Sequence, residues 1–312
     1  MRARGRWDTK RGDLALVVAA VCFGATFLVV QDAIERVEPI PFLAVRFAIG
    51  AAVLWPLARR RPASSGELRH GALAGVALLI GYVFQTIGLQ YTGSATSAFI
   101  TYLLVVFVPV LGFVALGRRP HPVTLGAIAL AVVGLVLLTD PGGGAGGAGF
   151  GRGEVLTLGC ALAFAAHVVI LGETAHRHDP VRLAAVQVTV VAVGCALPGL
   201  WLGGYRMPGS ALVAAATTGL FATALAFVLQ VGAQRIVPPA RAALVLLLEP
   251  VFAGLLAAAT GDPLSATALV GAALILVAVA VSEILPGWLD QRVSAREAAP
   301  DNDRSQPVAV TD

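Results

Sequence analysis

Charged residues are scarce in this sequence. Asp, Glu, Lys and Arg together make up 13% of the 312 residues, whereas 57% of the residues are hydrophobic and the mean hydropathy is +0.83. A soluble globular domain typically carries about 25% charged residues. The shortage of charge therefore excludes an ordinary soluble domain and indicates a chain that lies within a membrane.

Cysteines are few, and the short motifs of catalytic and nucleotide-binding sites are missing. The three cysteines, Cys22, Cys160 and Cys195, lie in apolar stretches without CxxC or Cys/His spacing, so neither a metal site nor a disulfide is predicted. No GxSxG, HExxH, GKS or GKT motif occurs. The stretch Gly142–Gly147 satisfies GxGxxG only because it is mostly glycine. The sequence thus predicts no cofactor, no enzyme activity and no ATP-driven pump.

Long hydrophobic runs are what the sequence has in abundance. About 20 consecutive apolar residues suffice for a helix to cross the hydrocarbon core of a bilayer. Ten such runs predict an all-α polytopic membrane protein with ten transmembrane helices. They cover residues 14–30, 42–57, 71–90, 96–116, 122–138, 155–172, 181–202, 211–230, 240–259 and 265–285.

The basic residues predict the orientation of the chain. The net charge is +4 and the pI is near 9.3, but the Lys and Arg residues lie in connections that alternate along the chain, so no nucleic-acid partner is predicted. If the N-terminus is cytoplasmic, eighteen of the 22 Lys and Arg residues fall on the cytoplasmic side. We therefore expect a multi-pass protein of the plasma membrane with both termini in the cytoplasm and a disordered cytoplasmic tail over residues 286–312.

The chain contains an internal repeat. A shift of 141 positions aligns Asp13 with Glu154, Pro39 with Pro180, and Pro109 with Pro250. This predicts two five-helix repeats, at 12–138 and 154–285, joined by a Gly-rich linker at 139–153. Asp13 and Glu154 are expected to cap the helices that open the two repeats.

An odd number of spans in each repeat has a topological consequence. The second repeat must enter the membrane from the opposite side, which makes the two halves inverted repeats. Inverted repeats are the architecture of many secondary transporters, whose substrate site lies near the midplane between the repeats and is exposed alternately to the two sides. The alternative is that duplication only produced a larger helix bundle.

Ionisable residues within a span are costly and count as candidates for function, and Glu249, Arg46 and His167 are the candidates here. Glu249 is near the middle of the ninth span and precedes Pro250, which should kink the helix, so this stretch can act as a hinge and as a site for a proton or a cationic group. Pro109 is its repeat counterpart. His167 is a candidate for the substrate path, or makes a plain hydrogen bond. Arg46, whose repeat counterpart is Gln187, is expected to have a structural role.

Uncharged polar residues within spans extend this set. Tyr82 and Gln85 share one face of the third span with Leu89. Tyr102 in the fourth span and Gln230 at the end of the eighth are similar candidates for contact with a substrate. Interhelical hydrogen bonding is the alternative role for all four side chains.

Three stretches resemble a known family. They are FGATFLVVQDAIERVEPIPFLAVRFAIGA at 23–51, LQYTGSATSAFITYLLVVFVPVLGF at 89–113 and LLLEPVFAGLLAA at 246–258. With the duplication, they resemble the EamA-type transporters of the drug/metabolite transporter superfamily. The resemblance implies two inverted five-helix repeats around a central cavity and export of amino acids or other metabolites. Glu249, Pro250 and Arg46 match positions that the family commonly shares.

These observations favour a secondary transporter that exports small metabolites, such as amino acids or related compounds, by alternating access. Its partners would be a small-molecule substrate, the lipid bilayer, and protons or an exchanged solute; a homodimer is left open. Two rival hypotheses are a membrane scaffold or receptor without transport activity and, with less support, an intramembrane enzyme. Against the latter, His167 is the one histidine within a span and has no partner motif in the sequence.

Overall fold

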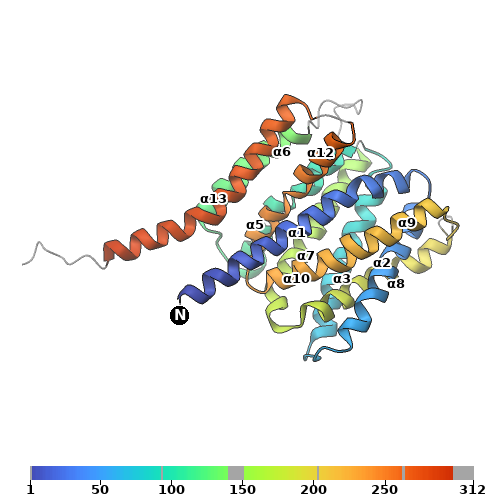
Figure 1. Ribbon diagram of the computed structural model, residues 1–312, viewed down its shortest axis with the longest axis horizontal. Coiled ribbons are helices and arrows are strands. Elements are labelled where there is room, and N and C mark those ends of the chain that lie inside the picture. The colour runs from blue at the N-terminus through green and yellow to red at the C-terminus, as the bar shows by residue number, and fades with distance from the viewer. Residues whose placement is uncertain (1, 93, 140–150, 202–203, 262–263, 298–312) are drawn as a thin grey trace, which may run out of the picture.

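The computed structural model describes residues 2–92, 94–139, 151–201, 204–261 and 264–297, and these residues form a bundle of helices without a strand (Figure 1). The α-helices are α1 Arg2–Ile34, α2 Pro39–Ala58, α3 Glu67–Gly88, α4 Ser94–Tyr102, α5 Leu104–Leu116, α6 Pro122–Thr139, α7 Arg152–Thr174, α8 Pro180–Trp201, α9 Gly209–Thr218, α10 Ala226–Gln234, α11 Pro239–Leu246, α12 Glu249–Ala259 and α13 Ala266–Glu297. A 3-10 turn, η1 Ala175–Arg177, follows α7, and a π-helical segment, η2 Gly219–Leu225, joins α9 to α10.

The helices account for the predicted spans. Within the described residues, eight helical stretches are long and apolar enough to cross a membrane. Four of these stretches consist of consecutive helices, at Thr96–Leu116, Arg152–Arg177, Gly209–Gln234 and Pro239–Ala259. The predicted first span lies inside α1, and the last predicted span overlaps a shorter apolar helix over Ala266–Ser282. The fold is therefore that of an all-helical polytopic membrane protein.

The end of the last helix differs from the sequence-based expectation. Helix α13 continues to Glu297, so residues 286–297 are helical rather than disordered, although Pro286 and Gly287 at the start of this stretch are poor helix formers. The rest of the expected tail, 298–312, and residues 140–150 of the expected linker lie outside the described residues.

The two predicted helix caps behave differently. Glu154 does cap its helix, because its carboxylate accepts a hydrogen bond from the backbone N–H of Gly151 at 2.9 Å. Asp13 does not cap α1, because this helix begins at Arg2, eleven positions earlier. Asp13 instead forms an ion pair with Arg241 of α11, with 2.5 Å between Oδ2 and a terminal guanidinium nitrogen.

Equivalent helices of the two repeats pack against one another. Helix α2 packs against its counterpart α8, and α6 packs against its counterpart α13; Figure 1 shows α13 running beside α6. Helix α3 contacts α7, while α1, the counterpart of α7, contacts the α9–α10 stretch that corresponds to α3. Such an exchange of partners is what a two-fold relation between the repeats produces.

The relation is an inversion. Arg182, at the start of α8, donates a hydrogen bond to the carbonyl of Ala58, at the end of α2, with 3.1 Å between the atoms. At the other end of the same pair, Gly199 of α8 lies against Pro41 of α2. Counterpart helices α2 and α8 are therefore antiparallel, as inverted repeats require.

Helices α6 and α13 approach unusually closely. A Cβ atom added to Gly271 would lie 2.4 Å from the backbone nitrogen of Leu138 and 2.5 Å from the carbonyl oxygen of Gly134. Real Cβ atoms do not come so near to backbone atoms. Small residues at such crossings let two membrane helices pack backbone to backbone.

Two of the membrane stretches are interrupted near the middle of the bundle. Between α11 and α12 the chain breaks at Leu247 and Leu248, whose N–H groups donate to carbonyls three residues earlier. The irregularity expected at Glu249–Pro250 is thus a two-residue interruption just before Pro250, which has no N–H to donate to the preceding turn; Leu247 still donates to Ala243 four residues earlier. The counterpart break lies at Leu103, between α4 and α5, whereas Pro109 sits inside α5.

Candidate functional site

A cavity of about 150 Å³ lies between the two repeats. Its walls come from α1, α2, α3, α4, α5, α7, α10 and α11 and from the first residue of α12. The six residues predicted to contact a substrate, Tyr82, Gln85, Tyr102, His167, Gln230 and Glu249, all line this cavity, as do Arg46 and Leu89. Pro109 and Pro250 are buried but are not among the lining residues. Whether the lining residues bind a substrate remains a prediction.

Arg46 brings a cationic group to the cavity. It lies on α2 with only 4% of its surface exposed, and its Nε donates a hydrogen bond to Oγ1 of Thr223 at 3.0 Å. The guanidinium carbon lies 5.4 Å from the ring centre of Phe47 and 5.5 Å from that of Tyr82. Both distances fall within the range of cation–π attraction.

Glu249 brings a carboxylate to the same cavity. The break after Leu248 makes it the first residue of α12, and the Tyr102 hydroxyl lies within hydrogen-bonding reach of its side chain. Among the ion pairs between described residues, none joins Glu249 to Arg46. The cavity therefore holds two groups of opposite charge that are not directly paired.

The side chain of His167 has a hydrogen-bonding partner on another helix. Its Nε2 lies 2.6 Å from Oε1 of Gln187, a fully buried residue of α8 and the repeat counterpart of Arg46. Gln230 donates to Gln234 at 3.3 Å, and Gln234 donates to the backbone carbonyl of Val168 at 2.8 Å. Gln187, Gln234 and Thr223 could not be assigned to this region from the sequence. The sequence does not indicate which side chain an amide or hydroxyl within a span will contact.

Aromatic rings form much of the remaining wall. Phe23 and Phe227 meet edge to face with 5.5 Å between ring centres. Tyr82 contacts Phe47 at 4.9 Å and Phe164 at 5.2 Å in the same manner. Rings packed in this way favour an apolar or aromatic body in the cavity.

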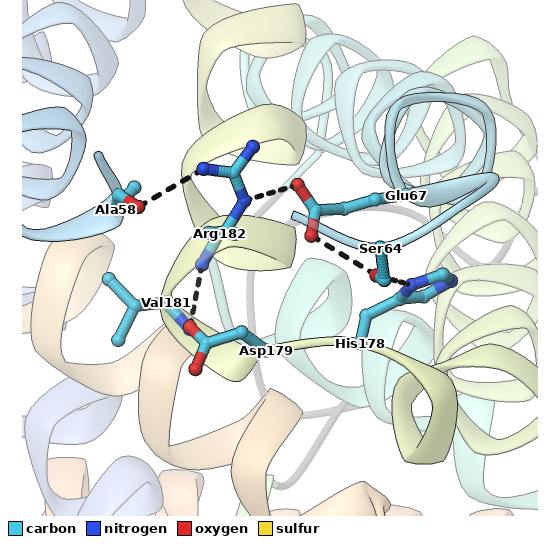
Figure 2. A network of polar contacts seen from close by, with 7 residues as sticks. All are labelled: Ala58, Ser64, Glu67, His178, Asp179, Val181 and Arg182. Atoms are coloured by element: carbon cyan, nitrogen blue, oxygen red, sulfur yellow. Dashed lines mark hydrogen bonds and ion pairs between the residues drawn. The ribbon is translucent and has the colours of Figure 1, made fainter. Parts of the chain in front are cut away.

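At one end of the bundle a polar network joins the two repeats (Figure 2). Nε of Arg182 donates to Oε1 of Glu67 at 2.6 Å, and Ser64 donates to the other oxygen of Glu67 at 3.3 Å. Asp179 caps α8 by accepting hydrogen bonds from the backbone N–H groups of Val181 and Arg182 at 3.0 and 3.2 Å. We call Ala58, Ser64, Glu67, His178 and Arg182 the inter-repeat network.

Histidines extend this network. Nδ1 of His178 lies 2.6 Å from the Ser64 hydroxyl, and its Nε2 lies 2.7 Å from Nδ1 of His70. His178 lies between two membrane stretches and is 3% exposed. Burial, and then the neighbouring His70, lower the pKa of His178, although Glu67 opposes this shift. The neutral form of His178 is therefore favoured in the folded protein.

The cavity and the network lie toward opposite ends of the bundle. The cavity reaches Ile34 at the end of α1, Phe42 near the start of α2, and Leu89 just after α3. The network involves the other ends of α2 and α3. The ion pairs of Glu67 with Arg182, Asp179 with Arg61, Glu173 with Arg118, and Asp13 with Arg241 all join the two repeats at the network end. Among the described residues, the one ion pair at the cavity end joins Asp32, in the last turn of α1, to Arg36, just after that helix, so it lies within one repeat.

Two inverted repeats around a polar and aromatic cavity are an architecture found in many membrane transporters. Comparison with known proteins identifies the family: residues 10–140 and 151–283 each match the EamA-like transporter family, and the chain belongs to it. It is therefore a multi-pass membrane protein of a transporter family, not an enzyme.

Individual proteins agree with this assignment. The chain is 30% identical over 271 residues to an uncharacterized transporter of Archaeoglobus fulgidus, covering 86% of this chain and 84% of that one. It is 25% identical to the uncharacterized transporter YvbV of Bacillus subtilis, over 61% of this chain and 63% of that one. A solved crystal structure of another protein superposes with a TM-score of 0.76 at 22% identity, covering 89% of this chain and 98% of that chain, which shows a shared fold.

Proposed function

We propose that this protein is a secondary exporter of small metabolites, such as amino acids or related compounds, that works by alternating access. The observation that carries the proposal is the cavity between the repeats, in which Arg46 and Glu249 face a common space without pairing. A polar solute with an apolar body is complementary to such a space. Glu249, His167, Tyr82, Gln85, Tyr102 and Gln230 would contact it.

The distribution of ion pairs supports alternating access. Four ion pairs hold the repeats together at the network end, while the cavity extends toward the opposite end. With the N-terminus in the cytoplasm, the network end is cytoplasmic and the cavity reaches toward the outside. The breaks near Leu103 and Leu247 would act as hinges when the repeats rock, with Pro250 and Pro109 in the moving stretches.

The test is untargeted metabolite profiling of the growth medium. Cells would express the wild type, Glu249→Gln, or an empty vector, with membrane levels of the proteins matched. Glu35→Gln is the control, because Glu35 is exposed beyond the end of α1. One chemical class should accumulate outside cells with the wild type and with Glu35→Gln, but not with Glu249→Gln. Identical media in all four cultures would count against export and favour a scaffold or receptor.

We further propose protons as the coupling ion, with an exchanged solute as the alternative. Glu249 and His167 are the groups of the cavity wall that can exchange protons on the transport cycle. Flux of the exported compound into proteoliposomes should then follow an imposed pH gradient. Flux that is insensitive to the gradient but requires solute inside the vesicle would assign exchange instead.

A further inference from the structure

Arg46 is a charged group whose contacts are all with uncharged neighbours. A guanidinium is protonated under all physiological conditions, and a charge inside a membrane bundle is costly unless an opposite charge or several hydrogen bonds compensate it. Within the described part of the chain, Arg46 has no carboxylate within ion-pair distance; its contacts are the hydroxyls of Thr223 and Tyr82 and the rings of Phe47 and Tyr82. Glu249, which lines the same cavity, acts on Arg46 only through space, so the guanidinium has no anion in direct contact.

Thr223 and the Tyr82 hydroxyl engage only part of the guanidinium and leave other N–H donors available. A guanidinium has five N–H donors, and the terminal pair can bind both oxygens of a carboxylate at once. In Arg46 the Nε–H is occupied by Thr223, so the interaction that fixes the side chain uses the donor at the base of the fork. The side chain lines the cavity, so an anion that enters the cavity can reach it.

Thr223 is held in place by its own surroundings. It lies in the π-helical segment η2 and is fully buried. An added Cβ at Gly50 of α2 would lie 2.6 Å from Cγ2 of Thr223, which shows how closely this segment packs on α2. Single π-helical turns occur often at functional sites. The turn here aims a hydroxyl at the side chain of Arg46.

From these contacts we infer that Arg46 is the carboxylate-binding subsite of the cavity and that Thr223 is its positioning residue. The substrate class is then small organic carboxylates with an apolar or aromatic body, whose second polar group lies toward Glu249 and Tyr102. This inference rests on the proposed transport function and deepens it. It gives Arg46 a binding role in place of the structural role expected from the sequence.

Three probes with the same aromatic body separate the charges: L-phenylalanine, 3-phenylpropionate and phenethylamine. We would measure thermal unfolding of the purified full chain in detergent with each probe. The two carboxylates should raise the unfolding temperature of the wild type, and phenethylamine should not. Absence of a shift with both carboxylates, or an equal shift with phenethylamine, would overturn the inference.

Variants test whether Arg46 and Thr223 cause the shift in unfolding temperature. Arg46→Gln should abolish the shift caused by the carboxylates, and Arg46→Lys should retain a small part of it. Thr223→Val should weaken the apparent affinity roughly tenfold without abolishing the shift, because one hydrogen bond to a charged group is lost. The matched control is Thr218→Val, since Thr218 is a buried threonine of the preceding turn whose hydroxyl bonds to its own backbone, to Ala214 at 2.7 Å.

Two further outcomes decide the remaining cases. If Arg46→Gln does not yield folded protein by size exclusion, Thr223→Val against Thr218→Val carries the test, and equal affinities in those two variants would overturn the inference. If the medium profile shows export of compounds without an anionic group, this inference fails while the proposed function stands. If no compound is exported, the proposed function itself fails.

Discussion

Glu67 of α3 and Arg182 of α8 form an ion pair across the repeat interface, with 2.6 Å between Oε1 and Nε. The two residues are 115 positions apart in the sequence. The side chain of Glu67 is 3% exposed and that of Arg182 is 16% exposed, so water screens the pair only weakly. This pair is the centre of the inter-repeat network and joins the start of α3 in one repeat to the start of α8 in the other.

Loss of Arg182 should destabilise the protein strongly. Arg182→Gln leaves the buried Glu67 carboxylate without its cation, and removing one partner of a buried ion pair costs on the order of 3–5 kcal/mol. Thermal unfolding in detergent measures the effect. The control is Arg36→Gln, which breaks an exposed pair with Asp32 and should cost about 0–1 kcal/mol. Equal losses in the two variants would contradict the assignment.

Acidification should destabilise the protein through His178. Because burial lowers the pKa of His178, the unfolded chain takes up a proton at a higher pH than the folded chain does. Well above a pH of about 6.5, the ordinary pKa of histidine, both states are neutral at this residue and its contribution is constant. As the pH falls below this value, stability should decrease until the lowered pKa of His178 is passed.

His178→Asn should remove this part of the pH dependence, whereas His121→Asn, at an exposed position, should leave it in place. The measurement is the unfolding temperature between pH 5 and pH 8. An unchanged pH profile in His178→Asn would show that another group causes it.

Two glycines of α6 offer a matched pair of substitutions. Gly134→Ala should destabilise the protein, because its new Cβ would lie 2.7 Å from the carbonyl oxygen of Gly271 and 3.0 Å from Ile275. Gly126→Ala meets open space and should be neutral or stabilising by up to about 1 kcal/mol, the difference in helix propensity. Unfolding temperatures of the two variants in the same detergent give the comparison. The close contact would be disproved by an unaffected Gly134→Ala protein.

Pro250 should matter for transport more than for folding. Pro250→Ala restores an N–H that can donate to the carbonyl four residues earlier, which favours a continuous helix through the break and moves Glu249. Export should fall while the protein still inserts at normal levels. Pro198→Ala is the control, because Pro198 lies exposed inside α8, away from the cavity. Equal export by the two variants would remove Pro250 from the mechanism.

Hydropathy predicted most of the fold because the conditions for a helix to cross lipid apply to each segment of the chain by itself. A helix that crosses lipid must satisfy its backbone hydrogen bonds internally and present apolar side chains along its length, and both conditions can be read from a window of residues. The repeat follows from the sequence in the same way. The boundaries of α1 and α13 could not be predicted, since charged helix formers continue a helix beyond the apolar run.

Only the tertiary structure decides which polar side chains come together in the cavity. The sequence identified Arg46 and Glu249 as unusual residues in lipid, but it could not place them in one cavity without pairing them. Nor could it join Arg46 to Thr223, 177 positions away, or His167 to Gln187. These contacts depend on how each helix is rotated and where it crosses its neighbours.

The sequence by itself thus determined the membrane class, the number of spans and the duplication, because lipid acts on each segment separately. The tertiary structure decided which charges are compensated within the protein and which face the cavity. Asp13 illustrates the difference: the repeat makes it equivalent to Glu154, yet Glu154 caps a helix and Asp13 pairs with Arg241 of the other repeat. Packing between two inverted halves gives equivalent positions different neighbours, and the neighbours determine the role.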